Sequence, residues 1–555
     1  MKIMKKRYIE LMAHALSAYT DEHINNYFTK VKTEGLTEHG FPRLTANIGI
    51  LISHGIRTDL FPLFCDMMDF CCEQIPKVRA ANDFSVREIV LCLMEVERAE
   101  IVDRSKLEGW KAQLDTIVAT SCYDRFAILP TDNVHNWACF TALSEFMRLY
   151  IGLGADPEFI DTQIASQLLP LDENGMYRDP HEPMVYDLVP RGLFALLLHF
   201  GYNGRYRDKV DNCLRTAGLH TLKMQSVTGE IPYGGRSNHC VFNEALIAIV
   251  LEYEAARYAR EGNTALAAQF KAGVRLALDA TERYLSLSPI HHVKNRFPLE
   301  SRYGCEKYAY FDKYMITTAS YLYSAYLLCD DSIEASDGVD NCVWQTSEHF
   351  HKVFMRHGDY SLEFDTNADT HYDISGLGRV HRRGAPSPIC LSLPCTSKPK
   401  YTIDIERSNK LSLCPCIKQD GEWQLGTSVK TGYELNRLDC NDACAEAQLL
   451  CTFEGGEKVT HSYCVNNDGI CITVRGKGEI GYILPAFVFD GQTSTVITAT
   501  KNTLDISYMG WICRYTTDAE ISELDRPARN RSGHYRTFIA TGKNQIKIKI
   551  EIIKA

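Results

Sequence analysis

The sequence predicts a multidomain protein of the α+β class, in which an N-terminal (α/α)6 toroid (residues 1–335) precedes a C-terminal antiparallel β-sandwich (residues 336–555). The first observation is the length, because 555 residues exceed what one hydrophobic core supports. The second is a change in the spacing of apolar residues near residue 330, from helical to strand-like. The third is an acidic stretch with glycine and serine at 331–339, which has the composition of a linker.

Before residue 330, apolar residues recur at i, i+3, i+4 and i+7 in segments separated by glycine, proline and aspartate. We expect about twelve such helices joined by short loops. Twelve helices cannot all bury a face in one bundle, but helical hairpins can close on themselves as a toroid. The acidic pair Glu252 and Glu254 is expected on a solvated helix face. Examples of the predicted helices are 136–150, 186–199, 240–258, 265–285 and 308–328.

After residue 330, short runs of alternating or β-branched residues are separated by turn residues such as those at 467–469 and 490–491. This pattern indicates an antiparallel, β-rich domain, and we expect two sheets packed face to face. The predicted strands include 401–406, 447–453, 470–474, 496–500 and 545–553.

Charge and hydropathy exclude several classes of function. The 60 Lys and Arg against 70 Asp and Glu give a net charge of −10, which argues against a nucleic-acid partner. No apolar run approaches the roughly 18–20 residues of a membrane span. The N-terminus is basic, but Glu10, His14 and Asp21 interrupt the apolar residues after it, so we expect an amphipathic helix and not a signal peptide. A cytoplasmic location is expected, with the periplasm as the alternative.

The 21 cysteines are an odd number, so they cannot all be paired in disulfides. The sequence has no CxxC pair, and the spacings nearest to a metal motif are Cys414/Cys416 and Cys440/Cys444. These spacings differ from those of common zinc sites, so we expect structural thiols and no metal. A reducing compartment is favoured.

Polar and aromatic residues cluster in loops that precede predicted helices, at 133–137, 172–180 (with Tyr186 and Asp187 following), 230–239 and 300–304. Because a helical toroid places such loops around one mouth, we expect these segments to converge on one cleft. The loops at 36–43 and 175–183 are expected to wall it and to favour short substrates.

Tyrosine, histidine, asparagine and arginine beside aromatic rings suit a sugar that carries a carboxylate. The matching reaction is β-elimination at a uronic acid, in which the proton at C5 is removed and the O4 substituent leaves. Asparagine, histidine or arginine donors neutralise the carboxylate, a tyrosine or histidine removes the proton, and a tyrosine or histidine protonates O4. This scheme needs no cofactor.

Asn136 and Tyr186, 50 residues apart, and the segment 174–177 before Tyr186 resemble motifs of the polysaccharide lyases built from a toroid and a β-sandwich, the heparinase II/III-like group. Within that group, segments 234–238, 243–244 and 378–382 look most similar to L-rhamnose-α-1,4-D-glucuronate lyases, which remove terminal rhamnose from arabinogalactan-type glycans. The resemblance implies an exo-acting carbon–oxygen lyase with a uronic-acid-containing oligosaccharide or polysaccharide as its partner.

The resemblance also assigns roles. Asn136, helped by His135, would neutralise the carboxylate, Tyr186 would be the acid or the combined acid and base, and His239 would be the alternative base. Tyr177 remains an alternative to Tyr186. The further residues expected to bind substrate are Trp137, Tyr233, Arg236, Asn238, Arg302, Tyr303, His371, Arg379 and His381.

Each assignment has a structural alternative. Asn136 could be an N-cap, Tyr186 and Trp137 could pack in the core, and Arg379 and His381 could join the two domains. Two other functions also stay open. A glycoside hydrolase would need two carboxylates across the cleft, such as Asp187 with Glu244 or Asp312, and a non-catalytic protein would bind the glycan without turnover.

Overall fold

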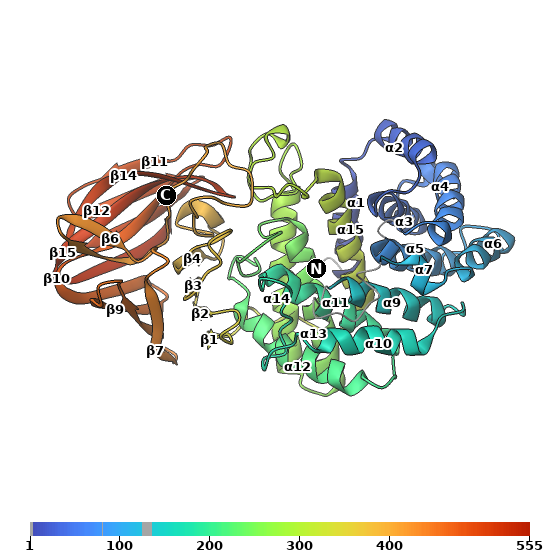
Figure 1. The fold of residues 1–555 in the computed structure, drawn as a ribbon, viewed down its shortest axis with the longest axis horizontal. Helices are drawn as coiled ribbons and strands as arrows, with labels where there is room; N and C mark the ends of the chain where they lie inside the picture. The colour runs from blue at the N-terminus through green and yellow to red at the C-terminus, as the bar shows by residue number, and fades with distance from the viewer. Residues whose placement is uncertain (1–3, 80–81, 125–135) are drawn as a thin grey trace.

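The computed structural model describes residues 4–79, 82–124 and 136–555. Helices form the first part of the chain and strands the second, so the α+β class is confirmed (Figure 1). The last helix ends at Leu328 and the first strand begins at Cys342. The predicted domain boundary at 335/336 lies in the segment between them.

Among the described residues, the helical part contains α-helices of 12 to 22 residues and one shorter α-helix. The helices are α1 (Met4–Leu16), α2 (Asp21–Glu34), α3 (Gly40–Ser53), α4 (Phe61–Gln74), α5 (Asn82–Arg98), α6 (Arg104–Asp115), α7 (Ala119–Cys122), α9 (Trp137–Tyr150), α10 (Pro157–Leu168), α11 (Met184–His199), α12 (Arg207–Met224), α13 (Phe242–Arg260), α14 (Thr264–Leu285) and α15 (Phe311–Leu328). Within the described ranges, no helix combines the length and the apolar character that crossing a membrane requires.

Six of these helices form a closed inner ring. In the order α3, α5, α9, α11, α13 and α15, each contacts the next, and α15 returns to contact α3. Other helices pack on them from outside: α4 on α3, α10 on α9, α12 and α14 on α13, and α1 on α15. The helix α13 is buried on nearly all sides, as expected of a helix surrounded by others.

The burial of α13 corrects one prediction. Glu252 and Glu254 are both fully buried, not solvated. Glu252 pairs with Lys271 at 2.6 Å and accepts a hydrogen bond from the Tyr8 hydroxyl, while Glu254 pairs with Arg257. A helix packed against α14, α11 and α15 has no solvated face, so its acidic residues need buried partners.

The strands form two antiparallel sheets, one of four strands (β1-β2-β3-β4) and one of eleven. They are β1 (Cys342–Gln345), β2 (Lys352–His357), β3 (Tyr360–Asp365), β4 (Gly376–Arg382), β5 (Pro415–Gln419), β6 (Glu422–Leu425), β7 (Gly432–Cys440), β8 (Ala445–Thr452), β9 (Lys458–Asn466), β10 (Gly469–Phe489), β11 (Val496–Ala499), β12 (Thr503–Tyr508), β13 (Trp511–Thr517), β14 (Glu520–Asn530) and β15 (Gly533–Lys554).

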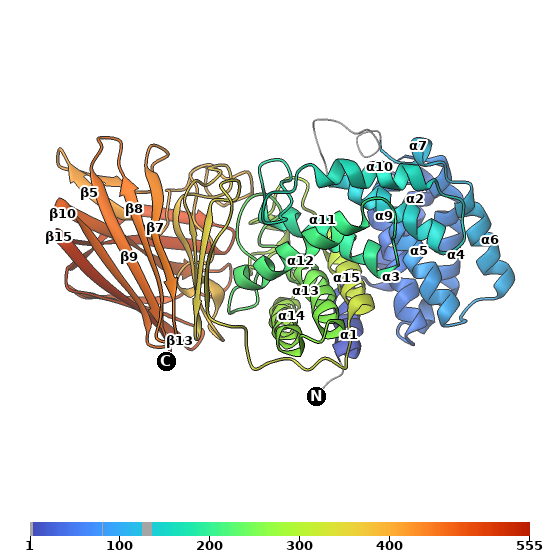
Figure 2. The same ribbon diagram turned by 90° about the horizontal axis from the view of Figure 1, so that it is seen from below.

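The four-stranded sheet lies between the helices and the larger sheet (Figures 1 and 2). One face of it packs on β7, β8 and β9, and the other meets α12. Met184 and Met224 from the helices pack with Phe354 of β2 in a small apolar cluster at that boundary. All residues of β2 and β3 are therefore buried, which is typical of a sheet covered on both faces.

Four of the predicted strands lie within or overlap β8, β10, β11 and β15, but the prediction of a strand at 401–406 is wrong. This segment is irregular. The Thr402 amide donates to Cys305, its carbonyl accepts from Gly304, and the Arg531 guanidinium stacks on the Tyr401 ring at 4.2 Å. The segment therefore contacts a loop of the helical part in place of a neighbouring strand.

The turn at Gly229 gives a test of this packing. Gly229 has φ +89°, and a Cβ there would lie 2.0 Å from the Leu276 carbonyl oxygen of α14. Gly262, at the end of α13, has φ +81° and open space around it. We expect Gly262→Ala to cost about 1–2 kcal/mol from backbone strain alone. Gly229→Ala should cost about 1–3 kcal/mol more, because α14 must shift. Denaturation midpoints measure both, and equal losses would contradict this packing.

Candidate active site

A cavity of about 410 Å³ lies at one end of the inner ring. Its lining comes from all six inner helices, mostly from the first turn of each or the residues just before it, with Val189, Thr317 and Tyr321 one or two turns further along their helices. The N-terminal end of a helix carries partial positive charge and unpaired backbone N–H groups, so six such ends favour an anion in this space. The lining residues are Thr37, Glu38, His39, Arg43, Phe84, Asn136, Trp137, Phe140, Tyr186, Val189, Phe242, Tyr308, Lys313, Tyr314, Thr317 and Tyr321.

Tyr186, a predicted catalytic residue, lines this cavity from the first turn of α11. Its hydroxyl lies 3.0 Å from the Ser237 hydroxyl, which is also 3.1 Å from the hydroxyls of Tyr308 and Tyr314. Burial raises the pKa of Tyr186 to about 12, although the Arg236 guanidinium, 4.5 Å above the ring, and Ser237 both oppose this shift. Tyr186 therefore holds its proton at neutral pH. The alternative Tyr177 is fully buried and donates to Gln167 at 2.6 Å.

The position of the Ser237 hydroxyl is fixed by a buried chain of contacts. The Ser237 backbone has φ +56°, and its amide donates to Glu306 Oε1 at 2.6 Å. The same oxygen accepts from Arg531, which lies in the turn between β14 and β15 and also donates to the Gly304 carbonyl at 2.7 Å. A residue of the β-rich part thus holds the loop that supports Tyr186.

Asn136 lines the cavity and occupies the N-cap position of α9, but its side chain does not cap the helix. Its amide nitrogen instead donates to Asp179 Oδ1 at 2.9 Å, and Asp179 forms an ion pair with Arg236. Burial raises the pKa of Asp179, and Arg236 and Asn136 oppose the shift. The structure therefore joins Asn136 to two of the predicted loops, 172–180 and 230–239.

His39 is a candidate that the sequence did not single out, although the loop containing it was expected to wall the cleft. It precedes α3, lines the cavity and lies against Phe84, with ring centroids 5.0 Å apart. Its Nδ1 is buried and has no hydrogen-bond partner among the described residues. Burial, with smaller contributions from Arg43 and Lys313, lowers the pKa of His39 well below its usual range. The imidazole is therefore neutral at pH 7.

His239 lies outside this cavity. It is buried with φ +65°, and its Nε2 is 2.8 Å from the Lys294 carbonyl and 3.2 Å from the Ser532 hydroxyl. Burial lowers the pKa of His239 well below its usual range. These contacts connect the helical part to the turn between β14 and β15.

The other predicted binding residues lie in different parts of the structure. Trp137 lines the cavity, edge-on to Phe84. Arg302 and Tyr303 shape nearby loops, since Arg302 donates to three carbonyls between 306 and 309, and Tyr303 stacks on Phe297 at 3.7 Å. His371 is exposed and pairs with Asp369. His135 lies outside the described residues.

Three of the remaining predicted residues, Tyr233, Arg379 and His381, lie where the two parts of the chain meet. Arg379 donates to the Ile231 carbonyl at 2.6 Å, and His381 Nδ1 is 2.7 Å from the Ser226 hydroxyl. Burial lowers the pKa of His381 to about 3. The Tyr233 amide donates to Glu363, and Asn238 donates to the Pro232 carbonyl. The contacts of Arg379, His381 and Tyr233 join the helical part to the β-rich part. The Asn238 contact lies within the loop 230–239.

The carboxylates suggested for a hydrolase do not meet in this cavity. Asp187 and Glu244 are fully buried and paired with Arg191 and Lys294. Of the acidic residues described, Glu38 lines the cavity, and it is bonded to Tyr27 and the Gly40 amide. Asp312 lines a neighbouring cavity of about 520 Å³, which shares Glu38 with the first.

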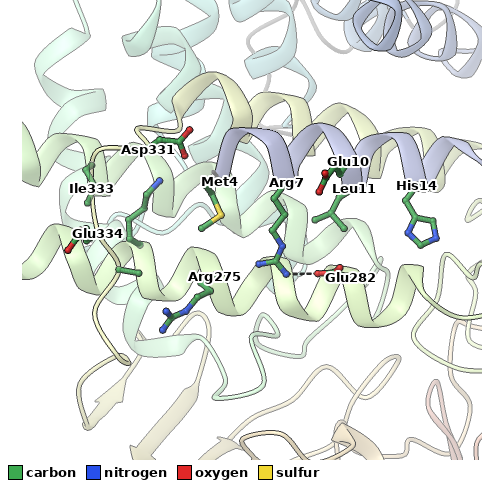
Figure 3. Close-up of a pocket in the computed structure, with 12 residues that line it drawn as sticks. Met4, Arg7, Glu10, Leu11, His14, Arg275, Glu282, Asp331, Ile333 and Glu334 are labelled. Atoms are coloured by element: carbon green, nitrogen blue, oxygen red, sulfur yellow. Dashed lines mark hydrogen bonds and ion pairs between the residues drawn. The ribbon is translucent and has the colours of Figure 1, made fainter. Parts of the chain in front are cut away.

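A larger cavity, of about 830 Å³, lies elsewhere, between α1, α14 and the segment 331–335 (Figure 3). It shares no lining residue with the Tyr186 cavity. Arg7 of α1 reaches across to Glu282 of α14 at 2.7 Å, which joins two helices of the fold (Figure 3). The convergence of the predicted residues, not size, therefore identifies the candidate site.

The contact between Arg531 and Glu306 gives a prediction for stability. Both side chains are buried, so Arg531→Met leaves an uncompensated carboxylate and should cost about 3–5 kcal/mol. The double variant Arg531→Met/Glu306→Gln should recover part of that loss. Arg514→Met, which breaks a more exposed pair with Asp505, is the control and should change stability by less than about 1 kcal/mol. Denaturation midpoints test this, and a double variant less stable than Arg531→Met would contradict it.

No family model matches the sequence, and no sequence among the curated proteins matches it. Solved structures do. Heparinase III has a TM-score of 0.53 at 9% identity, over 94% of this chain and 77% of that one. A mutant of the heparan sulfate lyase HepC from Pedobacter heparinus has a TM-score of 0.52 at 10% identity, over 93% and 76%. The chain therefore has the fold of these polysaccharide lyases.

Proposed function

We propose that the protein is a polysaccharide lyase that cleaves the bond to O4 of a uronic acid by β-elimination. The observation that carries the proposal is the convergence of six helix N-termini on one cavity with Tyr186, Asn136 and His39 around it. The helix ends supply a positive potential for the sugar carboxylate, and the three side chains supply an acid, an amide donor and a base. The names of the two solved lyases that share the fold support the same reaction class.

The helical ring with its outer layer supports an (α/α)6 toroid, and the two facing sheets support a β-sandwich. In that architecture the cavity is the mouth of the toroid. Its volume of about 410 Å³ is in the range that encloses a small ligand, which favours a terminal sugar unit over the middle of a long chain.

In the proposed reaction, the carboxylate of the uronic acid accepts hydrogen bonds from the Asn136 amide and from Lys313. Neutral His39 takes the proton from C5, a C4–C5 double bond forms, and the C4–O4 bond breaks. Tyr186 gives its proton to the departing O4. The pKa of Tyr186, near 12, and the lowered pKa of His39 suit these roles, because each group is in the required protonation state at neutral pH.

The other predicted residues act indirectly in this scheme. We propose that Arg236 and Asp179 hold Asn136 and Tyr186 in place, and that His239 positions the turn between β14 and β15. As the substrate, we propose a glucuronate-containing glycan, with exo-acting removal of α-1,4-linked L-rhamnose as the first activity to test.

Tyr186→Phe tests the reaction. Loss of the proton donor should lower kcat by about 10²–10⁴-fold with an unchanged melting temperature. Tyr150→Phe, an exposed tyrosine at the far end of α9, is the matched control. The assay follows the ultraviolet absorbance of the unsaturated uronate with a panel of uronate glycans that includes rhamnose-capped ones. New reducing ends without absorbance would indicate a hydrolase, and binding without products would indicate a non-catalytic protein.

The pH dependence tests the assignment of the base. Because burial lowers the pKa of His39, its neutral form persists as pH falls, so the acidic limb of kcat/KM should lie below pH 6.5. Tyr186, with a pKa of about 12, should give no alkaline limb below about pH 10. Lys313→Met should move the acidic limb upward, because Lys313 contributes to lowering the pKa of His39. An acidic limb above pH 6.5 in the wild-type enzyme would exclude His39 as the base.

A further inference from the structure

Cysteines with access to solvent gather on one face of the larger sheet, far along the chain from the candidate active site. Of the 21 cysteines, all within the described residues, 15 are buried. The six others include Cys444, Cys464 and Cys471, from the turn after β7, from β9 and from β10. Cys440 of β7, directly opposite the buried Ala445, instead packs against the core. The hydrophobic core of the sheet does not explain thiols on its outer face.

The strand register places one carboxylate among them. Cys464 of β9 lies directly opposite Cys471 of β10 on one side and Glu446 of β8 on the other. Residues along β8 and β9 alternate between buried and partly exposed, and Glu446 and Cys464 are both on the exposed side. Directly opposed residues have Cβ atoms about 4.5–5.5 Å apart, so their functional groups can meet.

Cys444 completes a three-ligand arrangement. One ligand atom from each of Cys444, Glu446 and Cys464 lies within 4.8 Å of the other two. Cys444 Sγ is already 3.8 Å from Glu446 Oε1. In a tetrahedral zinc site, bonds of about 2.3 Å to sulfur and 2.1 Å to oxygen place two ligand atoms about 3.5–3.8 Å apart. Small side-chain rotations therefore bring the three groups to coordinating distance.

The surroundings hold two of these ligands in place. Asn441 Oδ1 accepts hydrogen bonds from the amides of Ala443 and Cys444, which fixes the turn. Arg437 lies 3.2 Å from Glu446 Oε2 and leaves Oε1 directed toward Cys444. Contacts of this kind around a metal ligand orient it.

We propose that Cys444, Glu446 and Cys464 bind a zinc-class divalent cation, with water as the fourth ligand. Two thiolates and one carboxylate form a donor set that suits zinc, and three protein ligands leave one position open. Binding releases the two thiol protons to solvent, and no electron transfer is involved. The site is independent of the proposed lyase function.

Cobalt titration tests the site with the metal alone. The full-length protein is reduced with a phosphine, freed of metal with a chelator and titrated with Co²⁺ without oxygen. We expect a thiolate-to-cobalt absorption band in the near ultraviolet that saturates at one equivalent and is bleached by Zn²⁺. Cys464→Ser should abolish the band, and Glu446→Gln should weaken Co²⁺ binding at least tenfold. Cys471→Ser, the neighbouring exposed thiol, is the matched control and should keep the band.

Several results would overturn the proposal: no band in the wild-type protein, a band that survives Cys464→Ser, or a band lost in Cys471→Ser. If Cys464→Ser lowers the melting temperature, Cys444→Ser in the turn must give the same loss of the band. Mass spectrometry of the aerobic protein supplies a second readout. A Cys444–Cys464 disulfide, with no cobalt band after reduction, would show a redox pair in place of a metal site.

Discussion

The closure of the inner helical ring is the constraint on which the candidate site depends. Because α15 packs against α3, the six inner helices run side by side, and their first turns must share one space. Unpaired N–H groups at those turns need partners or an anion. The candidate catalytic groups all come from these turns or from residues just before them, so their proximity follows from the closure and not from their order in the sequence.

The candidate site also depends on the β-rich part, which contacts the loop that supports Tyr186. Arg531 reaches Glu306, Glu306 accepts from the Ser237 amide, and the Ser237 hydroxyl contacts Tyr186. Each of the charged groups is buried, so the pair is costly to break once formed. The sheets therefore contribute to the site without lining the cavity, which explains why Arg379 and His381, predicted to bind substrate, lie in the interface between the parts.

The periodicity of apolar residues predicted the positions of the helices and strands well, but not which other residues surround them in the fold. The predicted helices and most of the predicted strands lie where the apolar spacing placed them, because burial of one face is a local property of the sequence. Glu252 and Glu254 were misassigned because their partners, Lys271 and Arg257, become neighbours only when α13 is enclosed. Asn136 and Tyr186 were singled out from the sequence as candidates because both precede or open helices with apolar stripes. His39 was not, because one histidine before a helix carries no signal until Phe84 and the unpaired Nδ1 are seen.

The candidate active site and the proposed metal site differ in how far the sequence alone could reveal them. Spacing arguments work for metal motifs on one turn or hairpin, and Cys414/Cys416 and Cys440/Cys444 were the nearest matches by that criterion. The structure instead brings together Cys444 and Cys464, twenty residues apart, because the register of β8 and β9 sets Cys464 opposite Glu446. A one-residue shift of that register would move Cys464 into the core. Ligand sets built across strands are therefore fixed by the fold, and a linear pattern does not reveal them.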